Sequence, residues 1–133
     1  MACVIAAPAS GSGKTILSLV IASWARQKKL KLQTFKVGPD YLDPQQLTAV
    51  SQRPCRNLDM VMCGNAWVRT SFYQFGGSAD LALIEGVMGL FDGIGSSEKG
   101  STADLARLLR LPIVLIIDAK GQAASLSALV KGF

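Results

Sequence analysis

Histidine is absent from the 133 residues, and cysteine is scarce. Without histidine, this chain cannot contain a Ser-His-Asp or Cys-His nucleophile, nor a histidine-ligated metal site. The cysteines Cys3, Cys55 and Cys63 are odd in number and form no C-x-x-C pair. A disulfide framework or zinc cluster is therefore not expected, and the composition is typical of a reducing, cytoplasmic compartment.

Long hydrophobic runs are also missing. The longest, Leu81–Ile84 and Pro112–Ile117, fall far short of the roughly 20 residues needed to span a membrane. The first residues are apolar at once, without the basic stretch that begins a secretory signal. We therefore expect neither a membrane partner nor a signal peptide.

The net charge is moderate, +5 from 14 Lys+Arg against 9 Asp+Glu. The tightest basic cluster, Arg26 to Lys31, lies where a helix should end, and the helix dipole favours cations there. No aromatic residues interleave with it, so nucleic-acid binding is not expected. Half of the residues are hydrophobic, which supports a folded core. At about 150 residues per domain, the chain is one domain or part of one.

Short apolar runs alternate with helical periodicities along the chain. The predicted strands are 2–7, 32–37, 80–84 and 113–117. The predicted helices are 14 to about 28–30, 65–75, 101–110 and 122–131. A further short helix is predicted to begin at Pro44, with Asp43 as its N-cap. Residues 51–63 show no regular pattern. Continuously apolar strands with intervening helices predict an α/β fold with a mostly parallel sheet and helices on both faces.

The C-terminal pattern predicts an incomplete domain. The sequence stops inside a helical pattern, directly after an apolar stretch and without a polar tail. We therefore expect residues 1–133 to be the N-terminal part of a longer protein.

A glycine-rich segment, Pro8–Thr15, follows the first strand and opens the first helix, the setting of a P-loop. Backbone N–H groups of such a loop surround phosphate oxygens, and the helix N-terminus adds partial positive charge. The residues predicted to bind nucleotide are Ser10, Gly11, Ser12, Gly13, Lys14 and Thr15. Lys14 would bridge the β- and γ-phosphates of ATP, and the Thr15 hydroxyl would bind Mg²⁺. Pro8 stands where the consensus has glycine, and a purely structural glycine turn is the alternative.

Charged residues follow two other strands, and ligands of parallel sheets bind at the carboxyl ends of the strands. Lys36 could neutralise the γ-phosphate or a substrate carboxylate. Asp40 is either a turn residue or a Mg²⁺ ligand. Glu85, directly after a buried strand, is where a second Mg²⁺ ligand belongs. Asp92 could orient the substrate or accept a proton.

These segments together resemble one family. The motifs are Ala7–Thr15, Lys36–Pro44, Asn57–Asp59, Glu85–Gly93 and Gly100–Ala106. They are similar to those of the cobyrinic acid a,c-diamide synthases, in which a proline at the Pro8 position is usual. The resemblance runs through essentially the whole chain, and it is specific because the second and fourth motifs occur together.

The resemblance implies a P-loop NTPase-like fold and a ligase of cobalamin biosynthesis. ATP would phosphorylate the a and c side-chain carboxylates of cobyrinic acid or a close corrin analogue. Ammonia, released from glutamine in a separate C-terminal domain, would then displace the phosphate. By resemblance, Lys14 and Thr15 bind ATP–Mg²⁺, and Asp40 and Glu85 serve the metal or phosphoryl centre. The substrate would contact Tyr41, Leu42, Gly86, Met88 and Asp92.

Nothing in the sequence resembles the glutaminase domain, so we expect the chain alone to be inactive. Other classes remain open. A carboxylate-activating enzyme of the dethiobiotin synthetase kind usually differs at Glu85–Gly89. Partitioning or metal-trafficking ATPases typically carry an additional lysine where Ala9 stands. A nucleotide-binding regulator without chemistry is a further alternative. Surface left uncovered by missing strands could also promote a homodimer.

Overall fold

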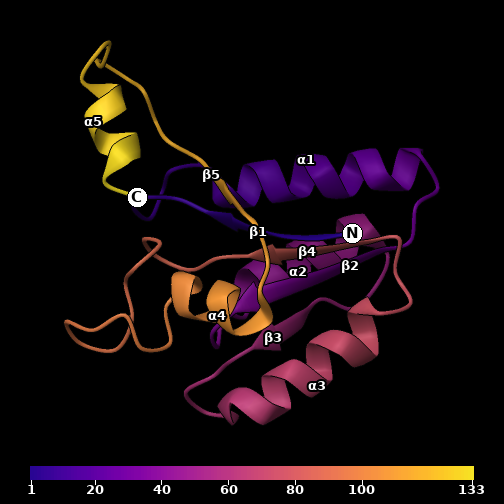
Figure 1. Cartoon of the computed structure of the whole chain (residues 1–133). Coiled ribbons are helices and arrows are strands. Elements are labelled where there is room, and N and C mark those ends of the chain that lie inside the picture. The colour runs from indigo at the N-terminus through magenta and orange to yellow at the C-terminus, as the bar shows by residue number, and fades with distance from the viewer.

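The computed structural model describes all residues, 1–133, and contains one five-stranded sheet (Figure 1). The strands are β1 (Ala2–Ala6), β2 (Leu32–Val37), β3 (Arg56–Leu58), β4 (Leu81–Glu85) and β5 (Ile113–Leu115). Their order is β3-β2-β4-β1-β5, and every neighbouring pair is parallel. The predicted α/β fold with a parallel sheet is confirmed.

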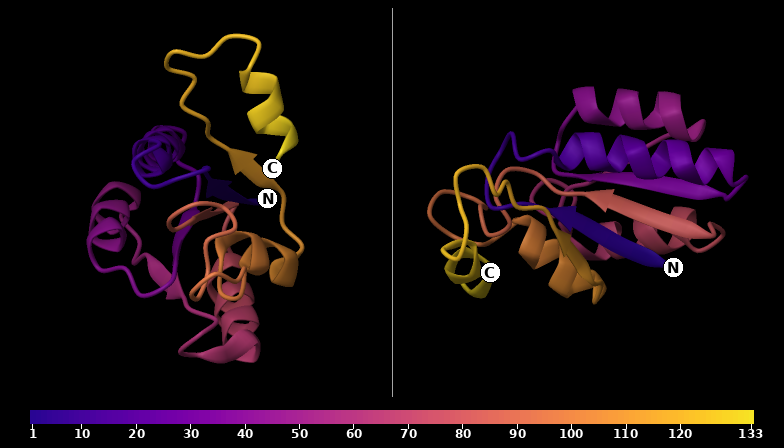
Figure 2. Two further views of the ribbon diagram at one scale, coloured as in Figure 1. Left: turned by 90° about the vertical axis from the view of Figure 1, so that its left-hand side faces the viewer. Right: turned by 90° about the horizontal axis from the view of Figure 1, so that it is seen from above.

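Helices cover both faces of this sheet, as predicted (Figure 2). They are α1 (Lys14–Gln27), α2 (Leu42–Ser51), α3 (Gly64–Gly76), α4 (Thr102–Leu109) and α5 (Leu126–Lys131). Helices α1 and α2 pack together on one face, and α3 and α4 pack on the other. Successive strand residues alternate between the faces, so Phe35 and Ile84 join the α3–α4 core while Ile5 and Leu83 join the α1 core.

The start of α2 differs from the prediction that Asp43 caps it. The helix begins at Leu42, and the Asp40 Oδ1 atom accepts the backbone N–H groups of Leu42 at 2.9 Å and Asp43 at 3.2 Å. Asp40 therefore satisfies the first free donors of the helix, and the Asp43 side chain is available for another contact. The prediction for α4 is confirmed, because the Ser101 Oγ atom accepts the Asp104 N–H at 3.1 Å.

The C-terminal part of the chain, β5 and α5, is packed less tightly than the rest. Strand β5 pairs only with β1, and α5 begins at Leu126 rather than at the predicted 122. No residue of α5 is buried, and the helix projects away from the sheet beyond β5 (Figure 1). Its end returns toward the body only through Phe133, whose ring stacks on Phe91 with centroids 5.6 Å apart. None of the five helices combines the length and the hydrophobicity of a membrane-spanning segment.

Candidate functional site

The loop Pro8–Thr15 connects β1 to α1 at the carboxyl end of the sheet. Gly11 and Gly13 have φ angles of +77° and +93°, a region that side chains rarely adopt, so both positions favour glycine. The Ser12 hydroxyl points back into the loop and donates to the Ala9 carbonyl at 2.9 Å. The first residues of α1 follow directly, and no acidic side chain lies in its first turn. The helix N-terminus therefore presents free backbone donors suited to an anion.

Lys14 lies inside this loop and is only 8% exposed. Its ammonium donates to the carbonyl oxygens of Ala9 at 3.0 Å and Met88 at 2.6 Å, and it forms no ion pair. Burial, followed by the positive charge of Lys36, lowers the pKa of Lys14. A partly buried cation held only by carbonyl groups is well placed to receive an anion.

Glu85 ends β4 and is 1% exposed. Its Oε1 atom accepts hydrogen bonds from the Thr15 hydroxyl at 2.7 Å and from the Lys36 ammonium at 2.9 Å. Its other oxygen, Oε2, is buried and has no hydrogen-bond partner. Leaving a carboxylate oxygen buried without a partner is costly, so this atom is suited to contact a cation or a hydrogen-bond donor.

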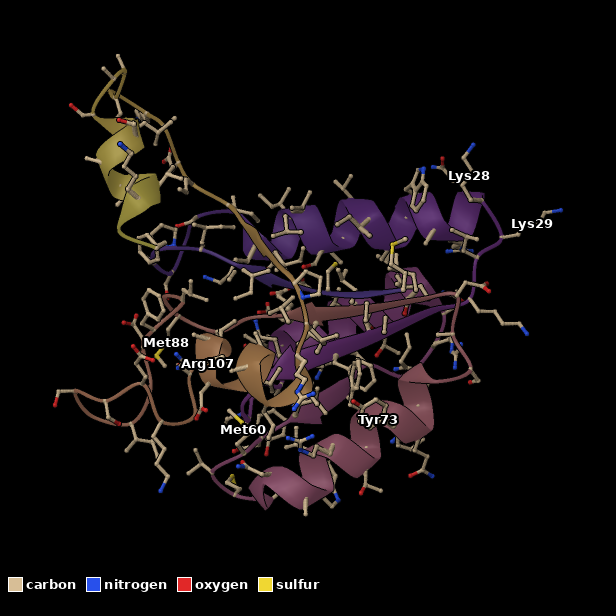
Figure 3. The ribbon with its side chains drawn as sticks, in the orientation of Figure 1. Lys28, Lys29, Met60, Tyr73, Met88 and Arg107 are labelled. Atoms are coloured by element: carbon tan, nitrogen blue, oxygen red, sulfur yellow. The ribbon has the colours of Figure 1, made fainter.

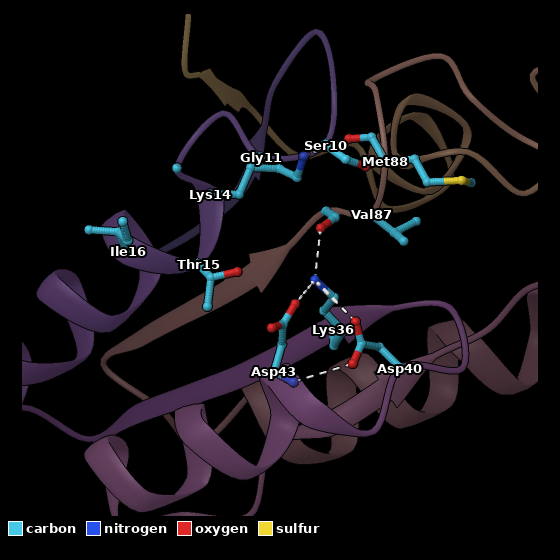
Figure 4. Close-up of a pocket in the computed structure, with 12 residues that line it drawn as sticks. Ser10, Gly11, Lys14, Thr15, Ile16, Lys36, Asp40, Asp43, Val87 and Met88 are labelled. Atoms are coloured by element: carbon cyan, nitrogen blue, oxygen red, sulfur yellow. Dashed lines mark hydrogen bonds and ion pairs between the residues drawn. The ribbon is translucent and has the colours of Figure 1, made fainter. Parts of the chain in front are cut away.

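Lys36 joins three carboxylates, of which Figure 4 shows those of Asp40 and Asp43. Its ammonium lies 2.5 Å from Asp43, 2.9 Å from Glu85 and 3.7 Å from Asp40, and it donates to the Gly86 carbonyl at 3.1 Å. Burial alone would lower the pKa of Lys36, but the hydrogen bonds to Asp43 and Glu85 outweigh it and raise the pKa. Lys36 lines the first cavity, and its ammonium is bound to acidic side chains of its own chain. That it faces a phosphate or a substrate stays a prediction.

A cavity of about 370 Å³ opens over these groups. The predicted site residues that line it are Ser10, Gly11, Gly13, Lys14, Thr15, Lys36, Asp40, Gly86 and Met88. Asp43 also lines it, although the sequence pattern predicted only a helix cap there. Three separate strand ends, those of β1, β2 and β4, thus meet at one site, as the parallel-sheet prediction required.

Five other predicted residues lie outside this lining. One of them is Glu85, whose buried carboxylate contacts the lining residues Thr15 and Lys36. The side chains of Tyr41 and Leu42 are 80% and 73% exposed, and Tyr41 borders a separate cavity of about 460 Å³. Ser12 turns into its own loop, as described above. The Asp92 Oδ2 atom accepts the Gly89 N–H at 2.8 Å, so Asp92 braces the loop after β4. A side chain at Gly89 would meet the Pro8 carbonyl at 2.5 Å, which explains the glycine.

Two further positioning residues were not predicted. The Asn57 amide donates to the carbonyl oxygens of Gly38 at 2.7 Å and Asp40 at 2.8 Å, and so fixes the turn after β2. The Thr102 hydroxyl accepts the Val87 N–H at 3.1 Å and donates to the Val87 carbonyl at 3.2 Å. Both residues belong to motifs already noted in the sequence, Asn57–Asp59 and Gly100–Ala106, but neither residue was given a role there.

The side chains of Thr15 and Glu85 fit a magnesium ion that is bound together with a phosphate group. No group of three or more Cys, Asp or Glu side chains is arranged to hold a metal ion by itself. However, the Thr15 hydroxyl and the unpartnered Glu85 oxygen are of the type that Mg²⁺ prefers, and it commonly takes its other ligands from phosphates and water.

Comparison with known proteins identifies close relatives, although no family model matches the chain. The chain is 53% identical over 131 residues to the cobyrinate a,c-diamide synthase of Syntrophotalea carbinolica, covering 98% of this chain and 28% of that protein. The chain is 46% identical to the Gloeobacter violaceus enzyme of the same name, over 100% of this chain and 30% of that protein. The hydrogenobyrinate a,c-diamide synthase of Streptomyces coelicolor is 46% identical, with 98% and 27% covered.

The chain therefore spans less than a third of the length of these relatives. The level of identity and the nearly complete coverage of the chain confirm the resemblance predicted from its motifs. Over nearly its whole length, this chain is homologous to part of the cobyrinate a,c-diamide synthases.

Proposed function

We propose that this chain is the N-terminal, ATP-binding part of a synthase that amidates the a and c carboxylates of cobyrinate or hydrogenobyrinate. The observation that carries the proposal is the Thr15–Glu85 pair beside the glycine loop, with one glutamate oxygen lacking a partner. Such a pair is suited to the metal ion of a nucleoside triphosphate. The names of the relatives point to the corrin substrate and to cobalamin biosynthesis.

The first step would be phosphoryl transfer to the substrate. A carboxylate oxygen attacks the γ-phosphorus of ATP, the bond from that phosphorus to the bridging oxygen breaks, and ADP leaves with the electron pair. Both reactants are anions, so the step depends on positioning and charge neutralisation rather than on a protein nucleophile. A chain without histidine is compatible with this chemistry.

The second step would form the amide. Ammonia attacks the carbonyl carbon of the acyl phosphate, the carbon–oxygen bond to phosphate breaks, and inorganic phosphate leaves as the nitrogen loses a proton. Ammonia would come from glutamine hydrolysed in the C-terminal part of the whole protein, which lies outside residues 1–133. The limited coverage of the relatives is consistent with this division.

The residues around the first cavity suggest separate roles. Lys14 would bind the β- and γ-phosphates, and the loop glycines would supply backbone donors. Thr15 and Glu85 would hold Mg²⁺, which would supply positive charge to the phosphate groups. Lys36 would act as a positioning residue that holds Glu85 and Asp43 in place. Asp40 and Asp92 would fix the turns on either side, with Tyr41 and Leu42 exposed toward the substrate.

The proposal is tested in a chimera in which residues 1–133 replace the matching segment of the Syntrophotalea carbinolica synthase. We expect the chimera to release ADP only when cobyrinic acid is present, and to turn over repeatedly only when glutamine or ammonia is present as well. Glu85→Gln keeps the size of the side chain but removes its charge, and should lower kcat about 100-fold. Glu98→Gln, an exposed glutamate paired with Arg107, is the matched control and should leave kcat unchanged. A folded chimera that releases ADP without a corrin would contradict the proposal.

A further inference from the structure

A second cavity of about 250 Å³ adjoins the first. Val87 and Met88, in the loop after β4, line both cavities, so the two spaces share a wall. The second cavity lies between this loop, the segment after β3 and the loop that precedes α4. Met60 and Met88 mark its position at one end of the molecule, opposite the end that carries Lys28 and Lys29 (Figure 3).

The lining of the second cavity is different in character from that of the first. Seven of its 13 residues are hydrophobic, compared with three of 12 around the first cavity. Val61 and Ile94 are 55% and 50% exposed, and Met60 is half-buried against the core. Exposed aliphatic side chains gathered around a hollow beside a charged site are typical of ligand pockets.

The second cavity also carries one free cation. Lys99 is its only basic residue, and the Lys99 ammonium forms no hydrogen bond or ion pair. The neighbouring Glu98 is paired with Arg107 instead. The only acid of the lining is Asp59, which is buried and accepts the backbone N–H groups of Val61 at 2.8 Å and Met62 at 3.0 Å. A negatively charged group at the rim would therefore meet Lys99.

Resting on the proposed function, we propose that the second cavity binds one apolar edge of the macrocyclic substrate, and that Lys99 pairs with a carboxylate that is not reacting. The lining suits an occupant with an apolar edge and a carboxylate beside it, which is a combination that a cobyrinate-class corrin offers. The shared wall then brings a neighbouring carboxylate toward the phosphate end of the first cavity. Ile94 and Lys99 become specificity-determining residues outside the phosphate-binding machinery.

The size of the cavity fits an edge rather than the whole macrocycle. Pockets that enclose a drug-sized ligand measure roughly 300–1,000 Å³, and this one is slightly smaller. The remainder of the substrate would extend outward over the exposed side chains of Val61 and Met62. Binding at the edge leaves several carboxylates accessible, as two successive amidations require.

The test measures binding of cobyrinic acid to the full 133-residue chain by calorimetry, with MgADP present. Ile94→Asp places a carboxylate in the apolar wall and should weaken binding at least about tenfold through desolvation and like-charge repulsion. The control is Val20→Asp, which makes the same change at a 57% exposed position of α1 that lines none of the three cavities, and should leave binding unchanged.

Lys99 is tested in the same way. Lys99→Ala should weaken binding about fivefold, the upper range for an exposed ion pair, and the difference should shrink in high salt. Lys99→Arg should restore affinity to within about twofold, and Lys28→Ala on the far end of α1 is the control. A chain that binds MgADP but not cobyrinic acid, or variants that bind as tightly as wild type, would overturn this inference and leave the proposed nucleotide site intact. A folded chain that binds neither would overturn the proposed function itself.

Discussion

Replacing Lys36 with methionine is expected to lower the free energy of unfolding by about 3–5 kcal/mol, the range for breaking a buried ion pair. Methionine matches the length of the lysine stem but leaves Glu85 and Asp43 without their shared cation. The Glu85 carboxylate is 1% exposed, so water cannot replace the lost partner. Urea denaturation at pH 7 measures the change, with the exposed Lys31→Met as the matched control.

The loss of stability in Lys36→Met should depend on pH. Burial would raise the pKa of Asp43, but the hydrogen bond and charge of Lys36 outweigh it and hold the pKa below 3.8. The stabilisation from Asp43 is therefore complete above about pH 3.8 and disappears as the pH falls through the lower folded-state pKa. For Lys36, the raised pKa means that stabilisation is complete below about 10.5 and is lost as the pH rises through the folded-state pKa.

The difference between wild type and Lys36→Met should consequently be largest between these limits and should narrow in acid, where Asp43 becomes protonated. A variant as stable as wild type at pH 7 would show that the Lys36 cluster contributes no net stability. A difference that stayed constant down to pH 2 would contradict the ionic origin and point to lost packing of the lysine stem.

The Lys36 cluster shows which parts of the site could be predicted from the sequence and which could not. The loop Pro8–Thr15 was predictable because strand, glycines and helix are contiguous, so a local pattern contains the whole feature. The Lys36–Glu85 contact was not, because it depends on β2 lying beside β4 with Lys36 opposite Glu85. The order of the strands along the chain does not show that β2 and β4 are neighbours, because β3 lies between them in sequence but at the edge of the sheet.

Two of the elements that differ from the prediction, β3 and the start of α2, have local causes as well. Strand β3 has only three residues and borders an exposed segment, so it produces no measurable alternation. At α2, the order Asp43-Pro44 imitates a cap followed by a first helical residue. The structure instead uses Asp40 as the cap, which releases Asp43 for Lys36. Which of the two aspartates caps α2 is decided by the tertiary contact between Asp43 and Lys36. Residue propensities for helix caps do not include such a contact.

Replacing Lys14 with alanine is expected to weaken MgATP binding to the chain at least about 100-fold, since a lost charge-assisted contact to phosphate leaves its binding partner partly unpaired. The present contacts of Lys14 are two carbonyl groups, so its charge is available for the triphosphate. Calorimetry measures the affinity, and Lys28→Ala, an exposed lysine at the other end of α1, should bind as wild type.

Lys14 also links the glycine loop to the Met88 carbonyl, so a loss of affinity in Lys14→Ala has two explanations. Lys14→Gln separates them, because its amide can still donate to a carbonyl but carries no charge. If the charge is decisive, Lys14→Gln should bind MgATP as weakly as Lys14→Ala; if the link between the loops is decisive, glutamine should restore most of the affinity.

The pH dependence gives an independent check on the charge. Burial and the nearby Lys36 lower the pKa of Lys14 below 10.5, so the free site loses its cation earlier than an ordinary lysine would. Wild-type affinity should therefore begin to fall as the pH rises toward that lowered pKa, while the weak binding of Lys14→Gln stays level over the same range. Parallel curves for the two proteins would mean that another group, and not Lys14, controls nucleotide binding at this site.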